Sequence, residues 1–101
     1  MIESDLQAAV MEYARLMRWR LAHFHDSRRQ VKPGVFVGDA DARGFPDLVL
    51  VRERLVIAEL KGATTRVSAA QRGWIQALKL AGVETYIWRP KDWPEIERVL
   101  R

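Results

Sequence analysis

Apolar residues recur along the chain with two different periods, which together predict a small domain of helices and strands. Helical spacing extends over about residues 4–18 and again from Ser68 to about Leu80, and a short final helix is expected from Asp92. Short β-branched and aliphatic runs predict four strands, at residues 20–25, 48–51, 55–60 and 83–88. The predicted order is αβββαβα, which indicates an α/β fold with a small mixed sheet flanked by helices.

The pattern S-x-x-Q occurs at both long helices, as Ser4 to Gln7 and as Ser68 to Gln71. In this capping box the serine side chain bonds a backbone N–H of the first turn, and the glutamine returns a bond to the cap. Both helices are therefore predicted to begin at these serines. Gln7 could instead be a neighbour of a functional site, although the capping role is the one expected.

The strands 48–51 and 55–60 are separated by the charged triplet 52–54, which predicts a hairpin with a three-residue loop. Counting back along the antiparallel ladder from that loop places Asp47 opposite Glu59. Two carboxylates are therefore expected side by side at the end of an otherwise apolar hairpin.

Such a pair of carboxylates is costly unless a positive charge lies between them. Oxygen ligands of this kind suit Mg²⁺ or Mn²⁺. Lys61 is two residues after Glu59, so both side chains should point to the same face of the strand. The alternative is that Glu59 and Lys61 form an ordinary exposed charge pair on an edge strand.

Pro46-Asp47, followed after eleven residues by Glu59-Leu60-Lys61, resembles the signature of PD-(D/E)XK nucleases. The flanking residues extend the likeness, so that the chain resembles a stand-alone VRR-NUC (virus-type replication-repair nuclease) domain. These flanking residues are Gly44, Ser68, Gln71 and Trp74. The resemblance covers Glu3 to about Arg89, and residues 1–101 are expected to form one domain of this kind.

The resemblance implies a restriction-endonuclease-like core and a metal-dependent endodeoxyribonuclease. In that family pattern Asp47, Glu59 and the Leu60 carbonyl hold Mg²⁺ or Mn²⁺. Lys61 orients or deprotonates the attacking water, and Gln71 faces the site. Glu3 is the position that reaches toward the metal from the first helix, although it could equally be a plain first-turn acid that favours the helix N-terminus.

The composition fits a nucleic-acid partner. The 101 residues include 17 Lys and Arg against 13 Asp and Glu, and the net charge of +4 favours polyanions. No cysteine and no long apolar segment is present, so a cytoplasmic protein of a bacterial or phage-infected cell is expected, with no membrane partner. Residues 27–43 are predicted to be a long loop, with a brief extended piece at residues 35–37, that contacts DNA phosphates through basic side chains. These are Arg28, Arg29, Lys32 and Arg43.

His25 ends the first predicted strand and is expected to be a surface residue, with a phosphate contact as the lesser alternative. The function predicted from the whole chain is cleavage of branched DNA such as Holliday junctions, in DNA repair or phage replication, by a homodimer. A two-fold dimer would present two sites to the two strands of a junction. The alternatives are a non-catalytic nucleic-acid-binding accessory module and an interaction protein whose four tryptophans mark a partner surface.

Overall fold

The computed structural model of the chain describes residues 2–24, 29–32, 35–37 and 40–101. For residues 29–32, 35–37 and 40 it describes the backbone alone. All seven predicted elements form in the predicted order. They are α1 (Glu3–Leu16), β1 (Arg20–His23), β4 (Leu48–Val51), β5 (Leu55–Leu60), α2 (Ala69–Leu80), β6 (Glu84–Trp88) and α3 (Trp93–Leu100). Short 3-10 turns precede β4 at Ala40–Ala42 and α3 at Pro90–Asp92.

The main sheet is mixed, with the strand order β1-β4-β5-β6. Strand β4 pairs antiparallel with both β1 and β5, whereas β6 runs parallel to β5. A parallel neighbour requires a crossover connection, and α2 provides it. The α/β fold with a small mixed sheet flanked by helices is therefore confirmed, and β5, which carries Glu59, is an inner strand of the sheet.

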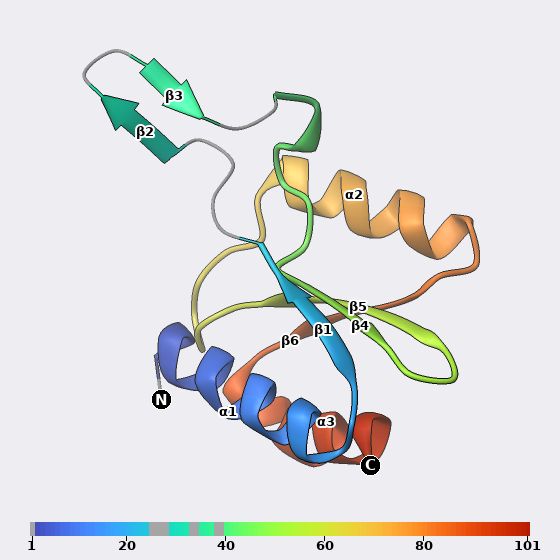
Figure 1. Ribbon diagram of the computed structural model, residues 1–101. Helices are drawn as coiled ribbons and strands as arrows, with labels where there is room; N and C mark the ends of the chain where they lie inside the picture. The colour runs from blue at the N-terminus through green and yellow to red at the C-terminus, as the bar shows by residue number, and fades with distance from the viewer. Residues whose placement is uncertain (1, 25–28, 33–34, 38–39) are drawn as a thin grey trace.

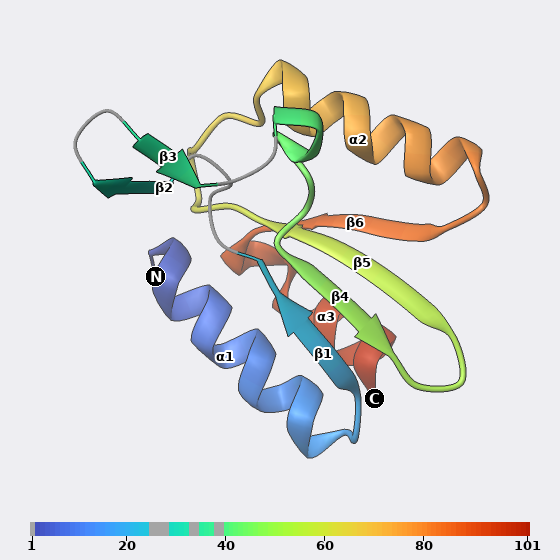
Figure 2. The same cartoon turned by 45° about the horizontal axis from the view of Figure 1, so that its top comes forward.

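The long loop predicted over residues 27–43 was only partly right: the brief extended piece expected at residues 35–37 is a strand, but it has a partner that was not predicted. This segment contains two further strands, β2 (Arg29–Lys32) and β3 (Val35–Val37), which pair antiparallel as a separate two-stranded sheet. Figures 1 and 2 show this pair projecting away from the main sheet. The sequence carried the signal, because two short runs with β-forming residues flank the dipeptide Pro33-Gly34, a common turn signal. The predicted order αβββαβα therefore omitted a hairpin.

The helices cover opposite faces of the main sheet, with α1 and α3 on one face and α2 on the other (Figure 1). The core lies between the sheet and helices α1 and α3. Alternate residues of β4 and β5, such as Leu48, Leu50 and Val56, are buried there with Leu6 and Val10 of α1. None of the helices in the described parts of the chain is long and apolar enough to cross a membrane.

The four tryptophans are buried or partly buried. Trp88 is completely buried and Trp19 is 4% exposed, while Trp74 and Trp93 are partly buried. The Trp19 indole N–H donates to the Leu100 carbonyl at 2.9 Å, so its polar atom is also satisfied inside the domain. Trp19 and Trp88 thus belong to the packing of the domain, while Trp74 and Trp93 pack against Phe45 and Tyr13 and stay partly exposed.

The two predicted helix starts have different outcomes. Ser68 caps α2 as predicted, and its hydroxyl accepts a hydrogen bond from the Gln71 N–H in a complete capping box. The capping box at Ser4 was wrong, because α1 begins one residue earlier, with Ile2 at the cap and no side-chain bond. The Ile2 carbonyl already accepts from the Asp5 and Leu6 N–H groups, so Ser4 is inside the helix.

Candidate active site

The hairpin brings the two predicted carboxylates together. Val51 is paired with Leu55 and Leu48 with Ala58, as the three-residue loop requires. Continuing this ladder by one residue places Asp47 beside Glu59. The Asp47 carboxylate is held in place by the backbone of β5, because its Oδ2 accepts a hydrogen bond from the Leu60 N–H at 2.8 Å.

Glu59 and Lys61 are an enclosed pair and not an exposed pair on an edge strand. The exposed fraction is 2% for Glu59 and 7% for Lys61. The Lys61 Nζ lies 3.6 Å from Glu59 Oε2, and the Lys61 N–H continues the sheet by donating to the Trp88 carbonyl at 2.9 Å. The inner position of β5 covers both edges of the strand, and Gln71 at the start of α2 contacts Glu59 on the face of the sheet. Since buried charges are rarely retained without a role or a partner, this pair is the centre of the candidate site.

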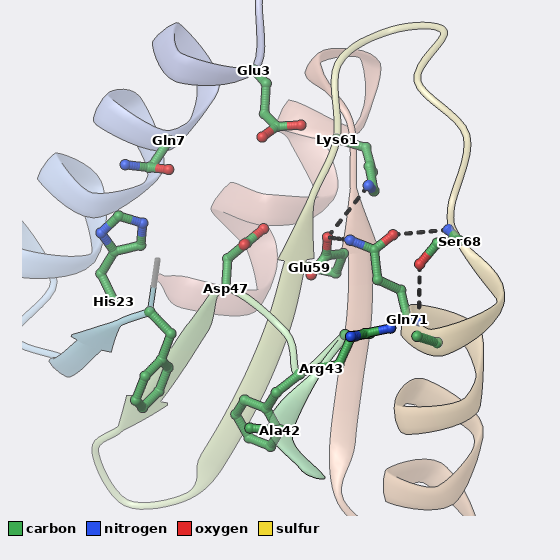
Figure 3. A pocket seen from close by; sticks show the side chains of 14 residues that line it. Glu3, Gln7, His23, Ala42, Arg43, Asp47, Glu59, Lys61, Ser68 and Gln71 are labelled. Atoms are coloured by element: carbon green, nitrogen blue, oxygen red, sulfur yellow. Dashed lines mark hydrogen bonds and ion pairs between the residues drawn. The ribbon is translucent and has the colours of Figure 1, made fainter. Parts of the chain in front are cut away.

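Gln71 performs both of its expected roles at once. Its Oε1 accepts from the Ser68 N–H at 2.9 Å, which completes the capping box, and its Nε2 donates to Glu59 Oε2 at 2.8 Å. Figure 3 shows the amide between Ser68 and Glu59, with both contacts drawn. The amide can serve both because it carries a donor and an acceptor at opposite corners. The start of α2 is thereby fixed against the carboxylate pair.

Gly44 allows the chain to approach α2 closely just before Asp47. Its φ is +83°, a conformation that side chains rarely adopt, and a Cβ atom there would lie 2.6 Å from the Ala70 carbonyl carbon. No other residue fits both requirements. Gly44 therefore lets the segment before β4 pack closely against the first turn of α2. This close packing positions Arg43, just before Gly44, and Asp47, just after it.

A cleft of about 640 Å³ contains these groups. Its walls come from α1, the end of β1, the start of β4, the end of β5 and the start of α2 (Figure 3). The lining residues with polar or aromatic side chains are Glu3, Gln7, His23, Phe24, Arg43, Phe45, Asp47, Glu59, Lys61, Ser68 and Gln71. Glu3 is the first residue of α1 and also lines the cleft. It is therefore both an acid in the first turn of the helix and a neighbour of the candidate site. Gln7 also lines the cleft, and its expected capping role was wrong.

The electrostatics of the cleft favour a bound cation. Burial raises the pKa of Glu59 to about 7, and the negative charge of Asp47 adds to the shift, while Lys61 opposes it. Burial likewise raises the pKa of Asp47, against the hydrogen bond from the Leu60 N–H. The negative charge of Glu3 acts in the same direction on both carboxyl groups. Crowded carboxylates with raised pKa values gain from a divalent cation, which stabilises their ionised forms.

One buried oxygen also points to such a cation. Within the described residues Glu59 Oε1 has no hydrogen-bond partner although it is inaccessible to solvent. An unpaired buried oxygen costs free energy, and a metal ion would satisfy it. The same residues contain no group of three or more His, Asp or Glu side chains that could hold an ion. The carboxylates that the structure brings together in the cleft are therefore Asp47 and Glu59, with Glu3 nearby.

The basic residues predicted to contact phosphates are only partly located. Arg43 is exposed and lines the cleft. Arg29 and Lys32 belong to β2, in which only the backbone is described, and Arg28 lies outside the described residues, as does His25.

Three cleft residues were not singled out from the sequence, namely His23, Phe24 and Phe45. The register of β1 could have located the first two, because His23 pairs with Leu48 and the next pair is then Phe24 with Asp47. The sequence pattern placed a strand at 20–25 but could not supply its partner or its register.

Comparisons of the chain with protein-family models, with curated proteins and with solved structures found no match. The resemblance to VRR-NUC domains therefore remains a prediction from the motif.

Proposed function

We propose that this chain is a metal-dependent, structure-selective DNA endonuclease with a VRR-NUC-like, restriction-endonuclease-type core. The observation that supports this most is the buried Glu59 carboxylate, which lies beside Asp47 and Lys61 and keeps one oxygen unpaired. A purely structural carboxylate at this position would be expected to have both oxygens satisfied.

Asp47, Glu59 and the Leu60 carbonyl are the groups that would hold Mg²⁺ or Mn²⁺. An ion bound there supplies Lewis-acid polarisation of the scissile phosphate and lowers the pKa of a water molecule. The bond between the Leu60 N–H and Asp47 Oδ2 fixes one carboxylate relative to the carbonyl-bearing residue. The Gln71 amide fixes the other through Glu59 Oε2 and leaves Oε1 for the ion.

Lys61 orients the attacking water and offsets the negative charge that develops on the phosphate. Its Nζ is held near Glu59 and is mostly shielded from solvent, where a charge acts more strongly than in water. The first turn of α2 borders the same cleft through Ser68, Ala70 and Gln71. Its partial positive charge favours an anionic phosphate at this end of the cleft.

Selectivity for branched DNA and assembly as a homodimer belong to the same proposal. A two-fold dimer presents two clefts at a fixed separation, which suits the two strands of a four-way junction. Arg43 places a cation at the rim of each cleft for the DNA backbone.

The test incubates the purified protein with four-way, flapped, forked and linear DNA, with Mn²⁺ or with a chelator. We expect cleavage only with the metal and faster cleavage of branched DNA than of linear duplex. Asp47→Ala and Lys61→Ala should each abolish cleavage while the fold is retained, because neither side chain belongs to the hydrophobic core. Glu53→Ala is the matched control, since Glu53 is an exposed acid on the opposite end of the same hairpin. Cleavage that survives Asp47→Ala, or that needs no divalent ion, would contradict the proposal.

A further inference from the structure

Phe24 lies beside the candidate catalytic carboxylates. The register of β1 and β4 pairs Arg20 with Val51 and His23 with Leu48, so the next pair is Phe24 with Asp47. The Phe24 N–H confirms this step by donating to the Asp47 carbonyl at 2.8 Å. Residues directly opposite on antiparallel strands point to the same face, with Cβ atoms about 5 Å apart. Asp47 stands in the same relation to Glu59, so the three side chains form one row across the sheet.

The Phe24 ring is both exposed and fixed. Its exposed fraction is 46%, although it lines the cleft with the polar groups of the site. The ring makes an edge-to-face contact with Phe45, with centroids 5.7 Å apart, and Phe45 makes the same kind of contact with Trp74 at 5.0 Å. Phe45 and Trp74 are only partly exposed, so Phe24 contacts a ring that is itself packed against the domain. A half-exposed aromatic ring next to a candidate catalytic centre, held by another ring, is unusual unless something packs on it.

The ligand that matches this cleft carries an anion and a flat apolar surface together. Lys61 and Arg43 line the cleft and complement a phosphate, and Phe24 complements a base. A base within a duplex is stacked on its neighbours, so its face is available to Phe24 only when the nucleotide is unpaired.

We propose that Phe24 is a stacking platform for one unpaired base next to the scissile phosphate. The inference rests on the proposed nuclease function and narrows its substrate to branched DNA with a single-stranded nucleotide at the branch, such as a fork or a flap.

The test is a thermodynamic cycle measured by fluorescence anisotropy without divalent metal, so that binding is read without cleavage. A labelled fork is compared with a linear duplex of the same sequence, using the wild-type chain and Phe24→Leu, which keeps an apolar side chain but removes the ring. We expect Phe24→Leu to weaken binding of the fork by roughly tenfold, as for the loss of one base–aromatic stack, and to leave duplex binding unchanged. Phe24→Tyr should restore fork binding, which separates loss of the ring from misfolding.

A second set of forks carries one abasic nucleotide, moved one position at a time through the branch. At one position the missing base should weaken binding to the wild type and remove the effect of Phe24→Leu, because both changes delete the same contact. Leu80→Ala is the control for loss of exposed apolar surface, since Leu80 is 82% exposed and does not line the cleft.

An equal loss on fork and duplex, or an effect of Phe24→Leu that persists at every abasic position, overturns the platform. A wild-type chain that binds no fork overturns it as well. If the protein cleaves DNA with a metal ion but the effect of Phe24→Leu does not depend on the abasic position, the stacking proposal is wrong and the nuclease proposal stands. If that effect does depend on the abasic position but no metal ion supports cleavage, the stacking proposal stands and the nuclease proposal is wrong.

Discussion

Glu59→Gln should stabilise the metal-free protein at alkaline pH while it abolishes cleavage. In the folded chain burial and the neighbouring Asp47 raise the pKa of Glu59 to about 7, from 4.5 for a free side chain. Between these two values the folded state binds more protons than the unfolded state, so stability falls as the pH rises from about 4.5 through 7. The neutral amide of glutamine removes this loss of stability, because it does not ionise.

The size of the effect follows from the shift. Each unit of pKa corresponds to about 1.4 kcal/mol, so the ionised Glu59 costs the metal-free fold up to about 3 kcal/mol above pH 7. Glutamine has nearly the same shape and can still accept the hydrogen bond from Gln71 that Glu59 Oε2 accepts. For a domain of this size we expect a rise in Tm of roughly 10 °C at pH 8.

The assay is thermal unfolding in chelator at a series of pH values. The difference in Tm between Glu59→Gln and the wild type should be near zero at pH 4.5 and should reach its full value above pH 7. Mn²⁺ should then stabilise the wild type and not the variant, because the ion needs the ionised carboxylate.

Glu53→Gln is the matched control in the same hairpin. The hydrogen bond from Arg52 lowers the pKa of Glu53 to about 2, so loss of its charge should not raise Tm at pH 8. A Glu59→Gln variant that is no more stable than the wild type at pH 8, or equally more stable at both ends of the pH range, would refute the reasoning.

Three further predictions concern the DNA contact, the seat of β4 and the assembly. Arg43→Gln should weaken binding to all DNA sequences and reduce the slope of log K against log salt by about one unit, as measured by binding titrations at several salt concentrations; an unchanged slope would show that Arg43 does not contact the backbone. Gly44→Ala should lower Tm and the cleavage rate together, because the added Cβ would meet Ala70 at 2.6–2.8 Å and φ is positive. Gly73→Ala is the control and should leave cleavage unchanged, because Gly73 has open space around it. Equal effects of the two substitutions would contradict the role of Gly44. Light scattering at micromolar concentration should find a homodimer, and a monomer at every concentration with and without DNA would remove the two-fold assembly from the proposal.

Much of the candidate site was predictable because its geometry is local. The three-residue loop at 52–54 fixes the hairpin register, and the register alone sets Asp47 opposite Glu59. Alternation along a strand places Lys61 on the side of Glu59, and the S-x-x-Q pattern places Gln71 in the first turn of α2. Each of these relations spans few residues, so short-range rules were sufficient.

The register of β1 was not predictable in the same way. Residues 24 and 47 are far apart in sequence, and no short turn links their strands, so no loop length fixes their alignment. The pattern therefore drew attention to His25, whereas His23 and Phe24 are the described residues of this strand that line the cleft. Strand β2 and its pairing with β3 were missed because the run is short and its basic residues resemble a phosphate-binding loop.

By itself the sequence determined the elements of the main sheet and its helices, their order and which side chains of the hairpin share a face, because periodicity and turn chemistry act over a few residues. Only the tertiary structure decided how those faces are enclosed. The crossover that joins β6 to β5 follows from the order of the elements, but only the folded chain shows that the first turn of α2 lies against Glu59, whose carboxylate is buried and has a pKa of about 7. The approach of Gly44 to Ala70 joins β4 to α2 in the same long-range way. Burial depends on what packs against a strand, and that is set by contacts between segments distant in the chain.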